Sequence, residues 1–199
     1  MSEPLIPGCY YHIYNRGNNG ENIFREERNY RYFLQLYAKY IQPIAETYAY
    51  SLLFNHFHTM ARMRDEAELK ELSSSEELSS YLSQQYANLF GTYTKAMNKA
   101  YQRTGSLFEN PFERKRVAND NYFTYLVAYI HRNPQTHGLV DDFRAWPWSS
   151  YGAMLSEKPT KVMRADVLEW FGGQAAFEDA HLMEVNERLI APLIVDDFV

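Results

Sequence analysis

The order in which strand-like and helix-like patterns follow one another is the feature that most constrains the fold of this chain. Between residues 10 and 133 the patterns run strand, helix, strand, strand, helix, strand, helix. This is the split βαβ order of ferredoxin-like folds, which build one antiparallel sheet. We therefore predict an α+β protein with a ferredoxin-like split βαβ core, one added helix and a short helical C-terminal appendage.

The periodicity of each segment carries this prediction. Short runs rich in aromatic and β-branched residues predict strands, and apolar residues spaced by three and four predict helices. Predicted strands span 10–15, 47–54, 56–63 and 112–118, and predicted helices span 26–41 and 78–97. A third helix is expected after a cap at Asn119 and Asp120. Pro134 is expected to end it at about Asn133, because the residue before a proline avoids helical geometry.

Length and composition favour one main domain, over residues 1–155, followed by an acidic, helical extension over 156–199 with short helices at 167–171 and 177–190. The N-terminus lacks the pattern of a secretory signal, and no apolar run is long enough to span a membrane. These features predict a soluble, cytoplasmic protein. The single cysteine, Cys9, excludes an intramolecular disulfide and any multi-cysteine metal site.

The net charge of −5 is unevenly distributed along the chain. Residues 1–140 hold 15 basic and 14 acidic side chains, whereas residues 141–199 hold 5 and 11. Within the first part, residues 95–116 hold six basic side chains against two acidic ones. Such a segment is able to contact phosphates, although a solvated charged surface would give the same pattern.

Two pairs of residues have the spacing of a chemical site. His56 and His58 lie at i and i+2 of a predicted strand, so both imidazoles face the same side and are able to bind one cation. Tyr129 and Asn133 lie at i and i+4 of a predicted helix, one turn apart on one face. A tyrosine beside a cation is able to attack a phosphodiester. Taken alone, each pair is more typical of a structural role than of a chemical site.

Five ordered blocks extend these pairs into a family resemblance. They are Tyr-His-Ile-Tyr-Asn-Arg-Gly-Asn at 11–18, Asn-His-Phe-His at 55–58, Arg-Thr-Gly-Ser-Leu-Phe at 103–108, Tyr-Ile-His-Arg-Asn-Pro at 129–134 and Trp-Pro-Trp-Ser-Ser-Tyr at 146–151. Over residues 10–151 the chain resembles the REP-associated tyrosine transposases, which are single-tyrosine HUH transposases of bacterial insertion sequences. It departs from the family pattern at Phe54, where proline is frequent, and at Asn110-Pro111.

The resemblance implies a transposase that cleaves and rejoins single-stranded, hairpin-forming DNA. Tyr129 would be the nucleophile and form a 5′-phosphotyrosine intermediate, while His56, His58 and Asn133 would bind Mg²⁺ or Mn²⁺. Single-stranded DNA with a hairpin, such as a REP-like sequence or an insertion-sequence end, would be the partner. The protein would be nucleoid-associated, as a monomer or homodimer. Its HUH nuclease domain would span residues 1–155.

Basic and polar residues near these blocks are the candidates for DNA contact: Arg16, Asn18, Lys95, Lys99, Arg103, Arg114, Lys115 and Arg116. Basic side chains would follow the phosphates, and aromatic side chains would stack on unpaired bases. Two other functions remain open on the sequence alone. One is a domesticated DNA- or RNA-hairpin-binding protein without catalysis, and the other is a metal-dependent phosphodiesterase that uses water.

Overall fold

The computed structural model describes residues 3–72, 74, 77–119, 122–183 and 191–192. Its centre is a four-stranded sheet of β1 (Tyr10–Arg16), β2 (Ala45–Leu52), β3 (His56–Met63) and β4 (Glu113–Arg116). The strand order is β2-β3-β1-β4, and all neighbours are antiparallel. This is the ferredoxin-like topology, so the predicted α+β class is confirmed.

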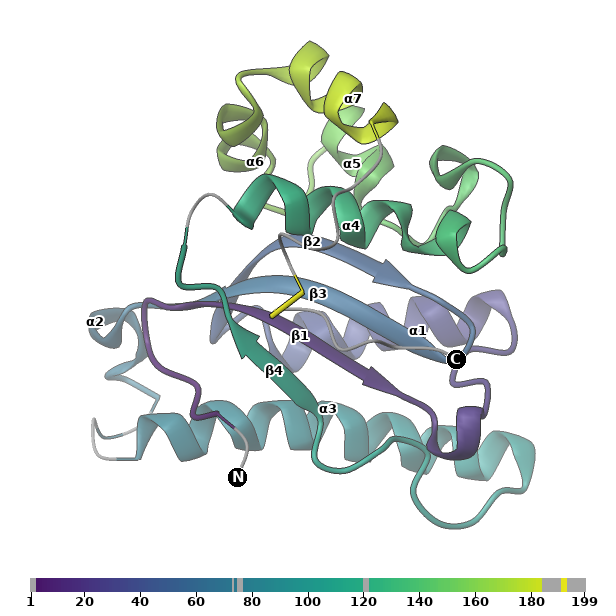
Figure 1. Cartoon of the computed structure of the whole chain (residues 1–199). Coiled ribbons are helices and arrows are strands. Elements are labelled where there is room, and N and C mark those ends of the chain that lie inside the picture. Colours follow the sequence, from purple (N-terminus) through teal and green to yellow (C-terminus); the bar gives the residue numbers. More distant parts are fainter. Residues whose placement is uncertain (1–2, 73, 75–76, 120–121, 184–190, 193–199) are drawn as a thin grey trace.

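Two layers of helices cover the two faces of the sheet (Figure 1). On one face lie α1 (Glu27–Tyr40) and α3 (Leu78–Tyr101), which share a core with inward-facing residues such as Ile13 and Phe57. On the other face lies α4 (Phe123–Thr136), whose apolar side packs on Tyr48 and Met60. Successive strand residues point to opposite faces, so each strand supplies side chains to both layers.

The C-terminal part of the chain packs on the outer side of α4. It contains α5 (Tyr151–Leu155), α6 (Arg164–Phe171) and α7 (Gln174–Leu182), with Val167 and Phe177 fully buried against the α4 core. The predicted helix over 177–190 overlaps α7 at residues 177–182, while residues 184–190 lie outside the described part of the chain. Two short helices, α2 (Glu66–Leu69) and α5, were not predicted.

The boundaries of α4 differ from the prediction at both ends. The helix begins at Phe123 with Tyr122 as its N-cap, rather than directly after Asn119, and Asp120 lies outside the described residues. The helix also continues through Pro134 to Thr136, so the prediction that Pro134 ends it was wrong. Proline removes only one donor, and the His137 and Leu139 N–H groups still bond to the Asn133 and Pro134 carbonyls. The last turn therefore survives, and Asn133 remains helical.

Within the described residues, no helix is both long and apolar enough to cross a membrane.

Candidate active site

The two histidines of β3 face α4. His56 and His58 are 4% and 1% exposed, and Phe57 between them packs on the opposite face against Phe33, with ring centroids 5.2 Å apart. The alternation of strand side chains produces this division, because a spacing of two residues returns to the same face. The strand thus holds both imidazoles in the layer between the sheet and α4.

Helix α4 brings Tyr129 and Asn133 to the same place. Asn133 Oδ1 lies 3.2 Å from His56 Nε2. The Tyr129 ring meets the His58 ring edge to face, with centroids 5.7 Å apart. Because these two α4 residues are one turn apart, one helix face presents both of them to the histidine pair. The structure therefore brings together the four residues that the sequence analysis singled out for metal binding and catalysis.

His12 is a fifth member of this cluster. It lies on β1, is 1% exposed, and its Nε2 is 3.0 Å from His58 Nδ1. Its ring is also 6.2 Å from that of Tyr129. A histidine that binds a metal commonly uses its second ring nitrogen in such a hydrogen bond, which fixes its tautomer and orientation. With the proton on His58 Nδ1, the lone pair of His58 is on Nε2.

The protonation of His56 follows from its neighbours. Burial lowers the pKa of His56 to about 3, so the imidazole is neutral near pH 7. Its Nδ1 lies 2.7 Å from Asn55 Oδ1, which only accepts, so Nδ1 carries the proton and donates it to this bond. Nε2 then holds a lone pair and faces Asn133 Oδ1, a second acceptor. A cation bound to both atoms would satisfy this arrangement. Without one, a half-turn of the amide would let Asn133 Nδ2 donate to His56.

Two buried atoms of the cluster lack a hydrogen-bond partner among the described residues: His58 Nε2 and Asn133 Nδ2. An unsatisfied buried polar group costs about 1–3 kcal/mol. Burial also lowers the pKa of His58 well below its usual value, so that it too is neutral. Neutral imidazoles with inward lone pairs are the form that binds metals.

The donor set fits a divalent cation only if the amide takes part. Within the described residues, no three His, Cys, Asp or Glu side chains are grouped to hold a metal. Two imidazole nitrogens and the Asn133 oxygen would complete a three-ligand set, in which mixed nitrogen and oxygen donors suit Mn²⁺ and also accommodate Mg²⁺. The unpartnered Nε2 of His58 supports this fit.

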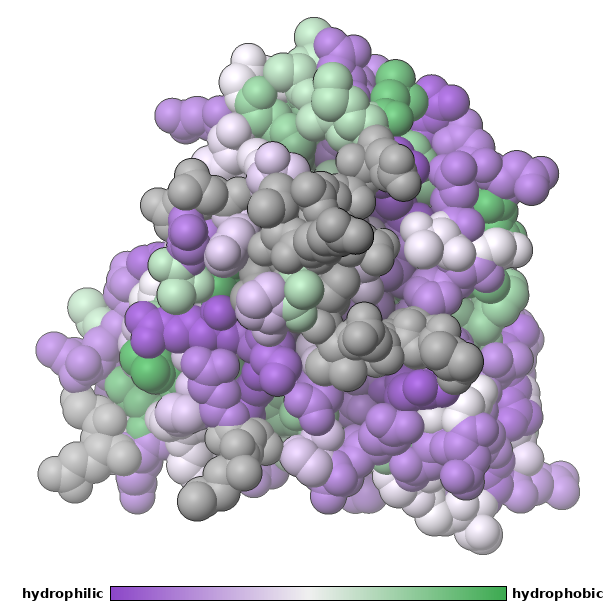
Figure 2. All heavy atoms as spheres, in the orientation of Figure 1, coloured by the Kyte–Doolittle hydropathy of each residue, from purple (hydrophilic) through white to green (hydrophobic). Residues whose placement is uncertain are grey.

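The candidate DNA-contacting residues do not form one surface. Arg16 and Lys115 lie beside the site, since Arg16 pairs with His56 and Lys115 with His12 in the register of the sheet. Lys95 and Lys99 are exposed on α3, which covers the opposite face. Figure 2 shows hydrophilic side chains over much of α3 and β4.

Several of these candidates also have structural partners. Arg103 is bound by Glu21 and Asn98, and its side chain is only 11% exposed. Arg114 donates to Ser83 Oγ at 2.9 Å and lies over the Phe112 ring. Asn18 Nδ2 donates to the Ser106 carbonyl, and the Arg116 backbone N–H donates to Glu3. For Arg103 these contacts occupy the guanidinium group that would otherwise meet a phosphate, and for Arg114 they occupy part of it.

Comparison with known proteins is informative for the fold. No family model matches the chain, and no curated protein matches it. Among solved structures, a REP-associated tyrosine transposase bound to a REP hairpin aligns with a TM-score of 0.60 and 16% sequence identity, covering 81% of this chain and 88% of the other. The resemblance noted in the sequence is thereby confirmed for the fold. The chain has the fold of a REP-associated tyrosine transposase.

Proposed function

We propose that the protein is a transposase that cleaves and rejoins single-stranded, hairpin-forming DNA through a covalent bond to Tyr129. The observation that carries this proposal is the convergence of Tyr129 and Asn133 on the His56 and His58 pair. The structural neighbour supports the choice of DNA, since it is a transposase bound to a REP hairpin. A phosphodiester next to this cluster would meet a nucleophile and a set of metal donors together.

The cleavage step exchanges one phosphorus–oxygen bond for another. The phenol oxygen of Tyr129 forms a bond to the scissile phosphorus and loses its proton, while the bond from phosphorus to the 3′ oxygen breaks. The leaving oxygen takes up a proton and becomes a free 3′-OH, and the 5′ phosphate remains on Tyr129. The covalent bond conserves the energy of the phosphodiester, so a 3′-OH is able to reverse the step and rejoin DNA without a nucleotide cofactor.

His56, His58 and Asn133 would hold the divalent cation, Mg²⁺ or Mn²⁺. When bound, the cation polarises the phosphoryl oxygen and favours the ionised form of a nearby phenol. His12 fixes the tautomer of His58, and the packing of α4 on the sheet fixes the direction of Tyr129. Arg16 and Lys115 lie on the site's face of the sheet and would bind the flanking phosphates.

Covalent capture tests the proposal directly. A single-stranded hairpin DNA is labelled at its 3′ end or its 5′ end and incubated with the protein and Mn²⁺ or Mg²⁺ before a denaturing gel. The 3′ label is expected to migrate with the protein, and the 5′ label to appear in a shorter free strand. Tyr129→Phe and His56→Ala should both abolish the adduct.

Tyr125→Phe is the matched control, because Tyr125 lies one turn earlier on α4 and is 41% exposed. This variant should form the adduct as the natural chain does. Cleavage that persists in Tyr129→Phe would instead favour a phosphodiesterase that uses water. Tight hairpin binding without cleavage of any DNA would favour the non-catalytic binding protein.

A further inference from the structure

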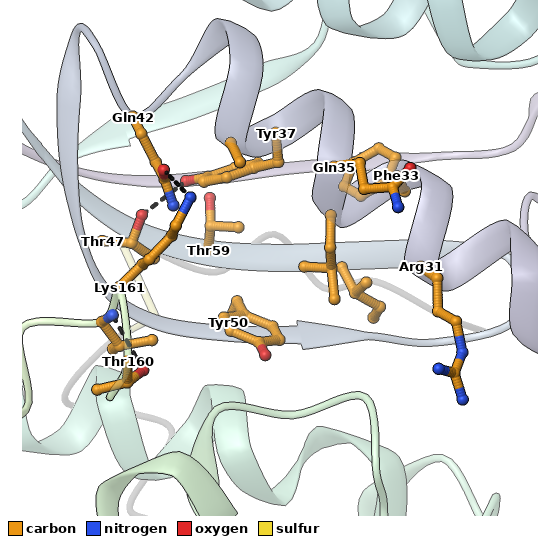
Figure 3. Close-up of a pocket in the computed structure, with 14 residues that line it drawn as sticks. Arg31, Phe33, Gln35, Tyr37, Gln42, Thr47, Tyr50, Thr59, Thr160 and Lys161 are labelled. Carbon is orange, nitrogen blue, oxygen red and sulfur yellow. Dashed lines mark hydrogen bonds between the residues drawn. The ribbon is translucent and has the colours of Figure 1, made fainter. Parts of the chain in front are cut away.

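A cavity of about 520 Å³ lies on the face of the sheet opposite the candidate active site. Its walls come from α1, from the edge strand β2 and from residues 160–162 (Figure 3). The apolar part of the lining consists of three rings and four aliphatic side chains: Phe33, Tyr37, Tyr50, Leu34, Ala38, Leu52 and Val162. Cavities of 300–1,000 Å³ are of the size that usually holds a small organic ligand.

The polar groups of the cavity favour an anionic ligand with hydrogen-bonding edges. Arg31 lies at one end and Lys161 at the other, and the described residues that line the cavity include no carboxylate. Gln35 and Gln42 supply amides, and Gln42 Oε1 accepts from Lys161 at 2.8 Å, which leaves its amide N–H groups for a ligand. The hydroxyls of Thr47 and Thr59 donate to the Tyr37 hydroxyl and the Ile13 carbonyl, so toward a ligand they act as acceptors. Together, the amides and hydroxyls are able both to donate and to accept, as the edge of a nucleobase requires.

A group of aromatic rings outside the cavity lining adjoins Arg31 through Trp148. The Arg31 guanidinium lies 5.9 Å from the ring of Trp148, which stacks on Tyr30 at 4.6 Å. Next to them, Trp146 meets Phe54 with ring centroids 5.6 Å apart, and Phe54 is 43% exposed. Rings and arginines of this kind bind unpaired nucleotides by stacking and by contact with phosphate.

This end of the cavity is close to the candidate active site along the chain. Leu52, in the cavity wall, pairs across the sheet with Phe57, which lies between His56 and His58. Phe54 is in the turn between them, two residues before His56. A DNA strand that passes around this turn would therefore run from one face of the sheet to the other, over an exposed aromatic ring.

We propose that the cavity binds one unpaired nucleotide of the DNA substrate. The base enters between α1 and β2, its phosphate contacts Arg31, and Phe54 stacks on a base between the cavity and the scissile phosphate. Arg31 already pairs with Glu27 at 3.0 Å, but both side chains are exposed, and such pairs exchange partners at little cost. This inference rests on the proposed function, because it takes single-stranded DNA as the ligand.

A fluorescent base analogue tests the assignment. 2-Aminopurine is placed in turn at each unpaired position of a hairpin DNA and mixed with the natural protein and a chelator, so that the strand stays uncut. At one position, binding should change the emission and protect the base from quenching by acrylamide. Ala38→Phe, which fills the cavity from a half-buried helix position, should remove this protection. Ala176→Phe, at a half-buried position of α7, should retain it.

Three further variants keep the test decisive. If Ala38→Phe lowers the thermal midpoint enough to unfold the protein, Leu34→Trp fills the same cavity one turn earlier. Arg31→Gln should weaken DNA binding about fivefold. Arg28→Gln should leave binding unchanged, although Arg28 is equally exposed and also paired with a glutamate.

Addition of Mn²⁺ to the same samples separates this inference from the proposed function. An adduct on Tyr129 without any protected base would overturn the cavity assignment alone. A protected base without an adduct would support the cavity and overturn the chemistry. Protection that persists in both cavity-filling variants would also overturn the assignment, because the base would then bind elsewhere.

Discussion

Two buried histidine pairs contact α4, and they differ in whether their ring nitrogens all have hydrogen-bond partners within the described residues. In the first, His12 and His58 lie under Tyr129, and His58 Nε2 has no hydrogen-bond partner within the described residues. In the second, His131 Nδ1 is 2.8 Å from His181 Nε2, between α4 and α7. We call the first pair open, because one of its ring nitrogens lacks a hydrogen-bond partner, and the second pair closed, because every ring nitrogen in it has one.

The second pair is closed by acceptor and donor groups at both ends. His181 Nδ1 donates to the Phe177 carbonyl at 2.7 Å, so His181 Nε2 accepts from His131 Nδ1. His131 Nε2 then accepts from Ser150 Oγ, also at 2.7 Å. A fully satisfied buried network stabilises one arrangement, whereas an unsatisfied ring nitrogen at the candidate active site leaves a position for a ligand. Burial alone therefore does not distinguish a structural histidine from a functional one.

The largest difference is expected in catalysis. His58→Leu should reduce the rate of covalent adduct formation by more than about 100-fold, because it removes one donor of the proposed metal site. His131→Leu should keep most of the adduct at a temperature where the variant is folded, since His131 has its side chain on the α7 side. Quantified gels of both variants check this. Equal losses would mean that the two pairs do not have separate roles.

Stability should show the reverse order. His131→Leu leaves His181 Nε2 buried without its partner and removes one of the hydrogen bonds of the Ser150 hydroxyl, which keeps its contacts with the Tyr50 backbone. It should cost about 2–4 kcal/mol in the free energy of unfolding. His58→Leu should cost less than half as much, because the imidazole it removes is itself unsatisfied at one nitrogen. Urea titrations of both variants, compared with Tyr129→Phe, measure these values. A greater cost for His58→Leu would contradict the distinction between closed and open networks.

A smaller effect is expected at His12, which contacts His58 but does not supply a metal donor in the proposed set. His12→Gln should weaken Mn²⁺ binding about 10- to 100-fold, as is usual for groups that orient a metal ligand. Calorimetric titration with Mn²⁺ measures the affinity without reference to activity. A variant that binds Mn²⁺ as the natural chain does would show that His12 only fills space.

The closed pair also predicts a pH dependence of stability. Burial lowers the pKa of His181 to about 4 in the folded protein, against about 6.5 in an unfolded chain. Between these values the unfolded chain binds the extra proton, so the free energy of unfolding falls as the pH decreases from 6.5 to 4. The slope from one histidine is at most about 1.4 kcal/mol per pH unit. A plot of the free energy of unfolding against pH between 4 and 6.5 should be flatter for His181→Gln than for the natural chain, by up to this slope. Equal slopes for the two proteins would refute the assignment.

The sequence was sufficient for the order of elements but not for all of their ends. Strand and helix periodicity predicted the ferredoxin-like topology, because each element buries one face. The prediction at Pro134 was wrong because the rule for proline ignores tertiary packing, and Pro134 is buried in the last turn of α4. Helices α2 and α5 are four and five residues long, too short for a periodic signal.

For the site, local spacing was informative and strand register was not. The i, i+2 and i, i+4 pairs were visible along the chain, and the resemblance joined them. His12 and His58 are 46 residues apart, and their contact depends on the pairing of β1 with β3, which local spacing does not predict. The sequence did contain one signal for His12: it lies at i, i+2 and i+4 spacing with Tyr14 and Arg16 on one strand, so the three side chains face the same side of the sheet. The partners of Arg103 and Arg114 likewise lie on other elements.

The two edges of the sheet bear on how copies of this protein can associate. On β2, the Thr47 carbonyl is bonded to Met163 N–H and the Leu52 N–H to the Trp148 carbonyl, so other parts of the same chain use this edge. On the other side, β4 is only four residues long and carries three basic side chains, which repel a second β4. Continuous sheets across two copies are therefore disfavoured at both edges. An assembly of this protein is therefore expected to use surfaces other than the sheet edges, so that the hydrogen bonds of the central strands β1 and β3 stay the same on association.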